Sequence, residues 1–386
     1  MTNVERSRAI LRFEQPDYYP IFGFPGAPGF SDGCMEPTRL RLCEQGMPGW
    51  VGKPRDGEKD RDSWRRYWGT TGPVYPDFSL ALPAKEISCE RRIEGAYEIL
   101  EYETGARTRQ LLDNDNQYSM PEFQRYHFYD RKGWERYRDL MTPSGMRSTE
   151  ELEAYCKSFD TGDELVAVSS GGTWGSIRSL MGTEAASVIL YDDPDLVREI
   201  MKYKIWYFET FTVPLIERVR PDILQVGEDN CYNHGMLISP EHFRRFCSPF
   251  YRRVREIADD CGVDLVALDT DGNAMELVSL LAECGVNGLF PFEVKAGNDL
   301  FALRRRHPRF VMFGWLEKEC VNEGNEAMIE GEILTKVPSL LKMGGYFPNG
   351  DHGIQPPITF DNLRRFMTLL HEVTGNPEGK FEQLYD

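Results

Sequence analysis

Short apolar segments alternate with amphipathic segments in a regular order from residue 165 to the end of the chain. Parallel strands need long crossover connections, usually helices, so this alternation predicts βαβ units and a parallel sheet. The predicted strands are Leu165–Ser169, Ile223–Gly227, Val263–Leu268, Gly288–Pro291, Phe310–Phe313 and Gly345–Pro348.

The segment between the strands at 223–227 and 263–268 carries clear helix signals. Ser239 is followed by Pro240, which is typical of an N-cap and the first helical position. Gly262 then predicts the end of the helix. Apolar residues recur every three or four positions, so they predict one buried face; they are Phe243, Phe246, Phe250, Val254, Ile257 and Cys261.

Two architectures fit this alternation, an open doubly wound sheet and a closed (β/α)8 barrel. The barrel is favoured because about eight strands are counted when Tyr18–Phe24 is included, and because no glycine-rich dinucleotide motif opens the first unit. The 386 residues fit a barrel with insertions. We therefore expect one α/β domain over 1–386, a TIM barrel, with an irregular insertion or cap at 25–140 that contains a β-hairpin within 90–112.

Polar side chains follow four of the predicted strands at their carboxyl ends, which meet at one mouth in a barrel. They are Glu228, Asp229 and Asn230 after one strand, Asp269 and Asp271 after the next, then Glu293, and last Asp351 and His352. Carboxylates at close range repel, so some must be protonated, paired with a cation or bound to a metal. Helix capping is the alternative; it is favoured for Asn273 and weaker for Asp269, which lies several residues before the next helix.

Charge and composition exclude several classes of protein. The net charge of −17 opposes binding to nucleic acid and to anionic membrane surfaces. The sequence has nine cysteines without a C-x-x-C pair, a polar N-terminal segment and no long apolar run. These features predict reduced thiols, no secretory signal, no membrane span and a cytoplasmic protein. The one compact basic run, 304–306, is predicted to be an exposed helix face.

Several stretches together resemble the superfamily of uroporphyrinogen decarboxylase and the cobalamin-dependent methyltransferases. Their order along the chain is more specific than any one of them; they are Arg6–Ile21, Met181–Val197, Leu237–Pro249, Asp269–Asn273 and Gly344–Asn362. The resemblance implies a (β/α)8 barrel and either decarboxylation or methyl transfer. Members of this superfamily are often dimers, so a homodimer is a further expectation.

Departures from the family patterns favour one branch. The decarboxylases carry an arginine-rich segment after the first strand, whereas residues 23–29 here contain no basic group. The thiol-alkylating methyltransferases bind zinc through His-x-Cys and a later cysteine, and the matching positions here are Asp269, Asp271 and His352. This harder ligand set puts a thiol substrate in doubt. The branch that demethylates methoxylated aromatics and other methyl donors is similar to this chain in its Asp-rich strand ends, and it is favoured.

That branch implies a small methyl donor and a corrinoid (cobalamin) on a separate protein, since no Asp-x-His-x-x-Gly corrinoid motif occurs. Asp269, Asp271 and His352 would hold a divalent metal such as zinc, or one carboxyl would donate a proton. The predicted catalytic residues are Glu228, Asp229, Asp271 and His352, and the predicted substrate-binding residues are Trp174, Asn230, Tyr232, Glu293 and Asp351.

Two other function classes remain open from the sequence. One is a decarboxylase or other lyase that acts on a small carboxylated substrate without a cofactor. The other is a non-catalytic barrel that binds a ligand, which the several acids at the strand ends make the weaker hypothesis.

Overall fold

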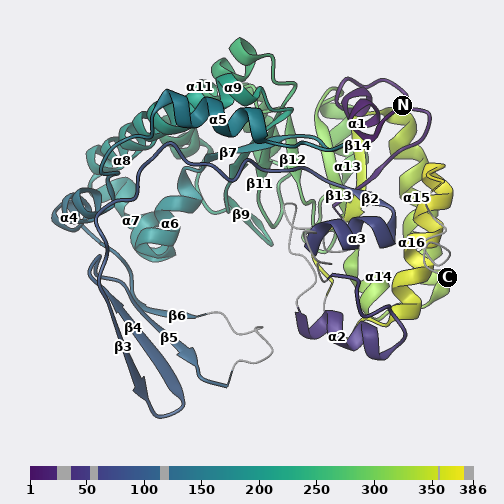
Figure 1. The fold of residues 1–386 in the computed structure, drawn as a ribbon, viewed down its shortest axis with the longest axis horizontal. Coiled ribbons are helices and arrows are strands. Elements are labelled where there is room, and N and C mark those ends of the chain that lie inside the picture. The colour runs from purple at the N-terminus through teal and green to yellow at the C-terminus, as the bar shows by residue number, and fades with distance from the viewer. Residues whose placement is uncertain (24–35, 53–59, 114–120, 355–356, 378–386) are drawn as a thin grey trace.

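A parallel sheet forms the centre of the computed structural model, which describes residues 1–23, 36–52, 60–113, 121–354 and 357–377. Six strands are hydrogen-bonded in the order β14-β13-β12-β11-β8-β7, all parallel (Figure 1). Their bounds are β7 Ala167–Gly171, β8 Ile223–Gly227, β11 Leu265–Asp269, β12 Gly288–Phe290, β13 Val311–Leu316 and β14 Tyr346–Gly350. Each predicted strand is present, with bounds shifted by a few residues at most.

Short N-terminal strands occupy the two edges of this sheet. β1 (Ile21–Phe22) lies beside β14 and pairs in parallel with β2 (Thr70–Thr71). Val74, just after β2, forms a parallel bridge with Val166, just before β7. β1 therefore lies at the β14 edge of the sheet, and Val74 lies at the β7 edge.

An inner core supports the barrel fold class. Side chains from β1 and from every strand of the sheet pack together there, and α1 (Asn3–Leu11) contributes Ile10 and Leu11. The rings of Phe22 and Phe347 lie 5.1 Å apart, and those of Phe313 and Phe347 stack at 4.6 Å. A core enclosed by strands in this way is what the interior of a small barrel contains.

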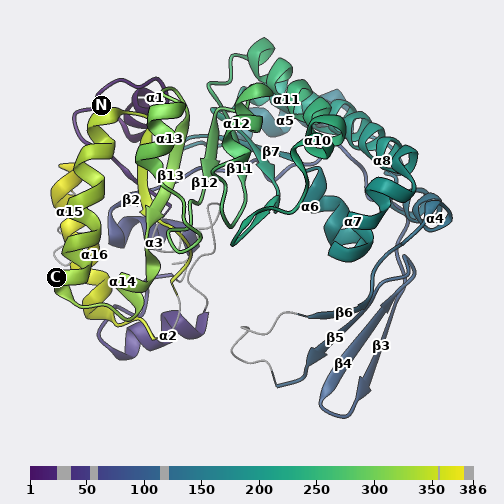
Figure 2. The ribbon, with the colours of Figure 1, turned by 180° about the vertical axis from the view of Figure 1, so that it is seen from behind.

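Helices pack around the outside of the sheet (Figures 1 and 2). They are α5 Thr149–Ser158, α6 Trp174–Met181, α7 Thr183–Asp192, α8 Pro194–Tyr207, α9 Val213–Val219, α10 Pro240–His242, α11 Ser248–Cys261, α12 Leu277–Glu283, α13 Leu300–Arg306, α14 Lys318–Asn322, α15 Glu326–Met343 and α16 Phe360–Thr374. π-helical turns at Phe208–Thr212 and Phe243–Cys247 precede α9 and α11. No helix in the described ranges is long and apolar enough to cross a membrane.

The predicted helix signals around 239–262 are confirmed. The Ser239 side chain accepts a hydrogen bond from His242 N, with Pro240 at the first helical position, and Gly262 ends α11 with φ of 72°. The predicted apolar face is buried along its whole length. Local signals are reliable here because the apolar face and the caps place the helix in the same position.

Residues within 25–140 contain regular elements that their composition conceals. They are α2 Glu36–Glu44, α3 Asp60–Trp68, β3 Cys89–Glu94, β4 Tyr97–Tyr102, β5 Arg107–Leu111, β6 Glu122–Arg125 and α4 Arg131–Met141. The predicted hairpin is β3 and β4, part of a four-stranded antiparallel sheet in the order β3-β4-β5-β6. In both views this sheet extends away from the barrel (Figures 1 and 2).

The prediction that 304–306 form an exposed helix face is wrong for Arg304, which is 5% exposed. Its guanidinium donates to the carbonyl oxygens of Pro308, Phe310, Gly344 and Gly345. Those carbonyls lie after α13 and before β14, so the buried cation joins two connections between helix and strand. Arg305 and Arg306 are exposed, as predicted.

We predict that Arg304→Met lowers the free energy of unfolding by about 2–5 kcal/mol, because buried carbonyls lose their donors. Urea unfolding followed by circular dichroism measures this change. The matched control is Arg305→Met on the same helix, which should stay within about 0.5 kcal/mol of the unmodified protein. Equal stability of the two variants would contradict the assignment.

Candidate functional site

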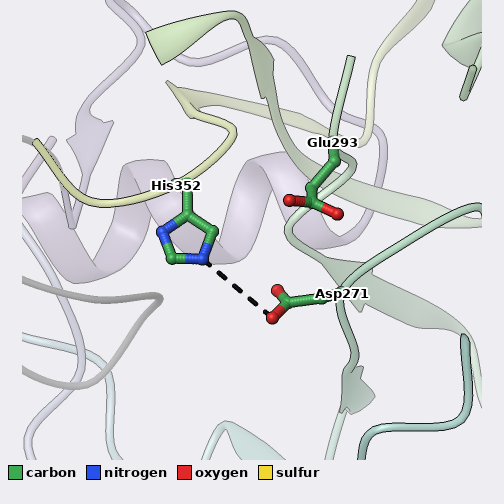
Figure 3. A group of neighbouring side chains, drawn as sticks. All are labelled: Asp271, Glu293 and His352. Carbon is green, nitrogen blue, oxygen red and sulfur yellow. Dashed lines mark ion pairs between the residues drawn. The ribbon is translucent and has the colours of Figure 1, made fainter. Parts of the chain in front are cut away.

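Asp271, Glu293 and His352 come together at the carboxyl ends of β11, β12 and β14 (Figure 3). One side-chain ligand atom from each lies within 4.8 Å of the other two. His352 Nε2 lies 4.0 Å from Asp271 Oδ2. The Asp271 side chain is about half exposed, whereas that of His352 is mostly covered. We call these three side chains the acid–histidine cluster.

The turn at Gly272 positions two members of the cluster. Its φ of 81° is favoured by glycine, and a Cβ there would lie 2.6 Å from the backbone nitrogen of Tyr232. Gly272 N donates to Glu293 Oε2 at 2.7 Å. The close approach of β9 (Cys231–Tyr232) and the orientation of Glu293 both depend on this glycine.

Asn298 connects the backbone segments that carry Asp271 and Glu293. Its Nδ2 donates to the carbonyl oxygens of Gly272 and Glu293, and its Oδ1 accepts from Ala274 N. The residue is 5% exposed. Sequence reasoning missed Asn298, because an asparagine just before a helix looks the same whether it caps that helix or holds two loops together.

Asp351 performs a similar role on the other side of the cluster. Its carboxylate accepts hydrogen bonds from Val294 N and Lys318 N, both at 2.9 Å. Burial raises the pKa of Asp351 to about 6, although these two donors act in the opposite direction. Asp351 therefore ties the segment after Glu293 to the strand end that carries His352, so its predicted substrate-binding role stays a prediction.

The proton on His352 determines what the imidazole does. Gly353 N donates to His352 Nδ1 at 2.9 Å, so in the neutral ring Nε2 carries the proton and faces Asp271. Nε2 binds a metal only when it is unprotonated, and the proton then resides on Nδ1. A metal bound at Nε2 would therefore place the ring proton on Nδ1, beside Gly353 N.

Glu228 belongs to a separate, buried network. Its carboxylate accepts from the backbone N and the Oγ1 of Thr173, from Gly175 N at 2.7 Å and from the Tyr251 hydroxyl at 2.8 Å. Burial raises the pKa of Glu228 above its ordinary value, with these donors opposing the change. The carboxylate holds the turn that starts α6.

The remaining predicted site residues lie around these two groups. Asp229 forms an ion pair with Arg178. Asn230 is fully buried, and its Nδ2 donates to the Tyr251 hydroxyl. Tyr232 is 64% exposed, whereas Trp174 is 1% exposed and lies in the hydrophobic core.

The predicted ligand set was Asp269, Asp271 and His352. In the described part of the chain the geometry groups Glu293, rather than Asp269, with the other two. Asp269 is the last residue of β11, and its carbonyl accepts from Glu228 N at 2.9 Å. Asp269 was predicted because it matches the first position of the family's His-x-Cys ligand pattern, and that pattern does not include Glu293.

The cluster fits a divalent metal by distance and by chemistry. An ion bound about 2.0–2.2 Å from each ligand atom holds those atoms roughly 3–4 Å apart. The three ligand atoms lie within 4.8 Å of one another, so the side chains would move by about 1 Å to reach that arrangement. Two carboxylates and one imidazole suit zinc and also harder divalent ions.

A parallel α/β fold with acids and a histidine at the carboxyl ends of its strands defines an enzyme of the TIM-barrel class. Residues 116–373, more than half of the chain, match the family described as uroporphyrinogen decarboxylase (URO-D). The chain belongs to this family, so the resemblance in its motifs is confirmed at that level.

Comparison with solved structures agrees on the fold. A methyltransferase from Methanosarcina mazei is similar with a TM-score of 0.54 and 15% sequence identity. The similarity covers 96% of this chain and 99% of the other. No curated protein sequence matches the chain.

We predict that the protein binds one Zn²⁺ or Mn²⁺ ion and that Asp271→Ala weakens this binding by about 100-fold or more, since even changes around ligands cost about 10–100-fold. Isothermal titration calorimetry of the metal-free protein measures it. Asp229→Ala, which removes the acid paired with Arg178, is the matched control and should keep the affinity. Absence of binding in the unmodified protein, or equal affinity in Asp271→Ala, would refute the site.

Proposed function

We propose that the protein is a methyltransferase that moves a methyl group from a small methylated donor to the corrinoid of a separate protein. The acid–histidine cluster carries this proposal, because it offers acid or metal chemistry at the mouth of the barrel. Family membership and a structural neighbour that is a methyltransferase are consistent with it. A methoxylated aromatic compound is the donor class that we favour.

The reaction breaks the bond between the methyl carbon and the heteroatom of the donor. The electron pair stays on the heteroatom, so an ether leaves as an anion that must be stabilised by a proton or a Lewis acid. Asp271, Glu293 and His352 would hold a divalent ion that supplies the Lewis acid. Without an ion, one of these carboxyl groups or the imidazolium of His352 would donate the proton.

Glu228 and Asp229 are assigned orienting roles in this proposal. The Glu228 carboxylate already accepts four hydrogen bonds and lies buried, which suits a residue that positions the Thr173 turn. Asp229 pairs with Arg178 on α6. Asn230 N donates to Thr270 Oγ1, and the Tyr232 carbonyl oxygen accepts from Asn273 N beside the Gly272 turn.

The methyl acceptor has to arrive from outside the chain, since the sequence has no Asp-x-His-x-x-Gly corrinoid motif. A cob(I)amide supplies the strong nucleophile that attack on an unactivated methyl group needs. We treat it as the second substrate, presented at the barrel mouth by its own carrier protein.

Decarboxylation of a small carboxylated substrate is the second candidate, favoured by the name of the matching family. The absence of any basic residue from 23–29 counts against a polyanionic tetrapyrrole as that substrate. Release of carbon dioxide in a substrate screen, without methyl transfer, would favour this alternative.

We predict that the protein transfers methyl groups from a methoxylated aromatic compound to cob(I)alamin, and that Asp271→Asn lowers kcat/KM by at least about 100-fold through lost stabilisation of the leaving anion. The absorbance change from cob(I)alamin to methylcobalamin measures the rate. Arg305→Met, at an exposed residue of α13 without an assigned role, should retain the full rate.

If Asp271→Asn had the same rate as the unmodified protein, the activity would not depend on the acid–histidine cluster. No transfer from any of a panel of ethers, amines and thiols, with either free cob(I)alamin or a corrinoid protein, would end the methyltransferase proposal.

A further inference from the structure

A cavity of about 330 Å³ lies beside the carboxyl end of β7, between α4, α6 and α8. It shares no lining residue with the acid–histidine cluster. Six of its fourteen lining residues are aromatic, among them Trp134 and Tyr137 on α4 and Tyr203, Tyr207 and Phe208 at the end of α8. Such a wall favours a flat apolar ligand.

Lys204 is the single charged side chain among the residues that line this cavity. Within the described residues, no hydrogen bond or ion pair is made by its ammonium group, although neighbours on the same helix are paired, such as Arg198 with Asp195. Burial lowers the pKa of Lys204 to about 8, and the charge of Glu228 opposes this change. A desolvated cation of this kind gains most from an anionic partner.

Small polar groups lie at the β7 end of the cavity. They are Ser170 and Ser176 and the backbone of Gly171 and Gly172. Gly172 has no room for a side chain, since a Cβ there would lie 2.0 Å from the Gly227 carbonyl oxygen. The wall at this end is polar and lies next to the turn that Glu228 holds.

We propose that this cavity binds a monocarboxylate with an aromatic ring, which lies against the tyrosine and tryptophan rings while its carboxylate pairs with the Lys204 ammonium. One cation matches one negative charge, so a phosphate dianion would remain half compensated in this apolar surrounding. Pockets for small ligands commonly enclose about 300–1,000 Å³, so the cavity suits a ligand of one ring. The inference does not depend on the proposed methyl transfer.

Benzoate is the probe for this site, with binding measured by calorimetry and by quenching of tryptophan fluorescence. The unmodified protein should bind it, and Lys204→Met should weaken binding by about 30-fold or more, as expected when a partly buried charge pair loses one member. Lys202→Met is the matched control, because Lys202 is an exposed lysine on the same helix. It should bind benzoate like the unmodified protein.

Three further measurements separate loss of binding from loss of folding and from effects of the acid–histidine cluster. Thermal unfolding of Lys204→Met should match that of the unmodified protein, because methionine fills the same space without the desolvated charge, and Lys204→Arg should retain binding to within about tenfold. Asp271→Ala should bind benzoate normally, which separates this site from the acid–histidine cluster. Absence of benzoate binding in the unmodified protein, or equal binding by folded Lys204→Met, would overturn the proposal.

Discussion

The parallel register of the central sheet is the constraint on which the site depends. Asp269, the last residue of β11, is level with Gly227 on β8 and with Phe290 on β12. The carboxyl ends of these three strands are therefore aligned, and the residues that follow them lie at the same edge of the sheet. The shared direction of the strands, rather than proximity in sequence, brings Asp271 close to Glu293 and His352.

The inner core holds β1 against the β14 edge of the sheet. Phe22, Phe313 and Phe347 pack on one another from β1, β13 and β14, and these rings are fully buried only if β1 lies against the β14 edge. Burial of about 150–250 Å² for each aromatic side chain is a large stabilising contribution. Once β1 is held there, β2 follows by pairing, and the Val74 bridge reaches the opposite edge.

Sequence reasoning succeeded where one local pattern determines the structure and failed where contacts distant in sequence decide it. β8 has the predicted bounds because its apolar run ends in a glycine. Two-residue strands such as β2 carry no pattern of their own and exist through their partners. Arg304 appears on a basic, amphipathic helix, and only the carbonyls of Gly344 and Gly345, about forty residues away, reveal that it is buried. Glu293 rather than Asp269 belongs to the acid–histidine cluster, and this likewise depends on the Gly272 turn, whose N–H donates to Glu293.

Glu228 and Asp271 both lie near strand ends, but their surroundings differ, and so do the roles that they can have. Glu228 is desolvated and its lone pairs are used by the Thr173 turn and Tyr251, so its charge stabilises the scaffold and has little left for a ligand. Asp271 is about half exposed and belongs to a cluster whose fixed members are held by Gly272, Asn298 and Asp351. The frame therefore holds two carboxylates close to an imidazole at the carboxyl ends of three strands, and Glu228 lies outside this group.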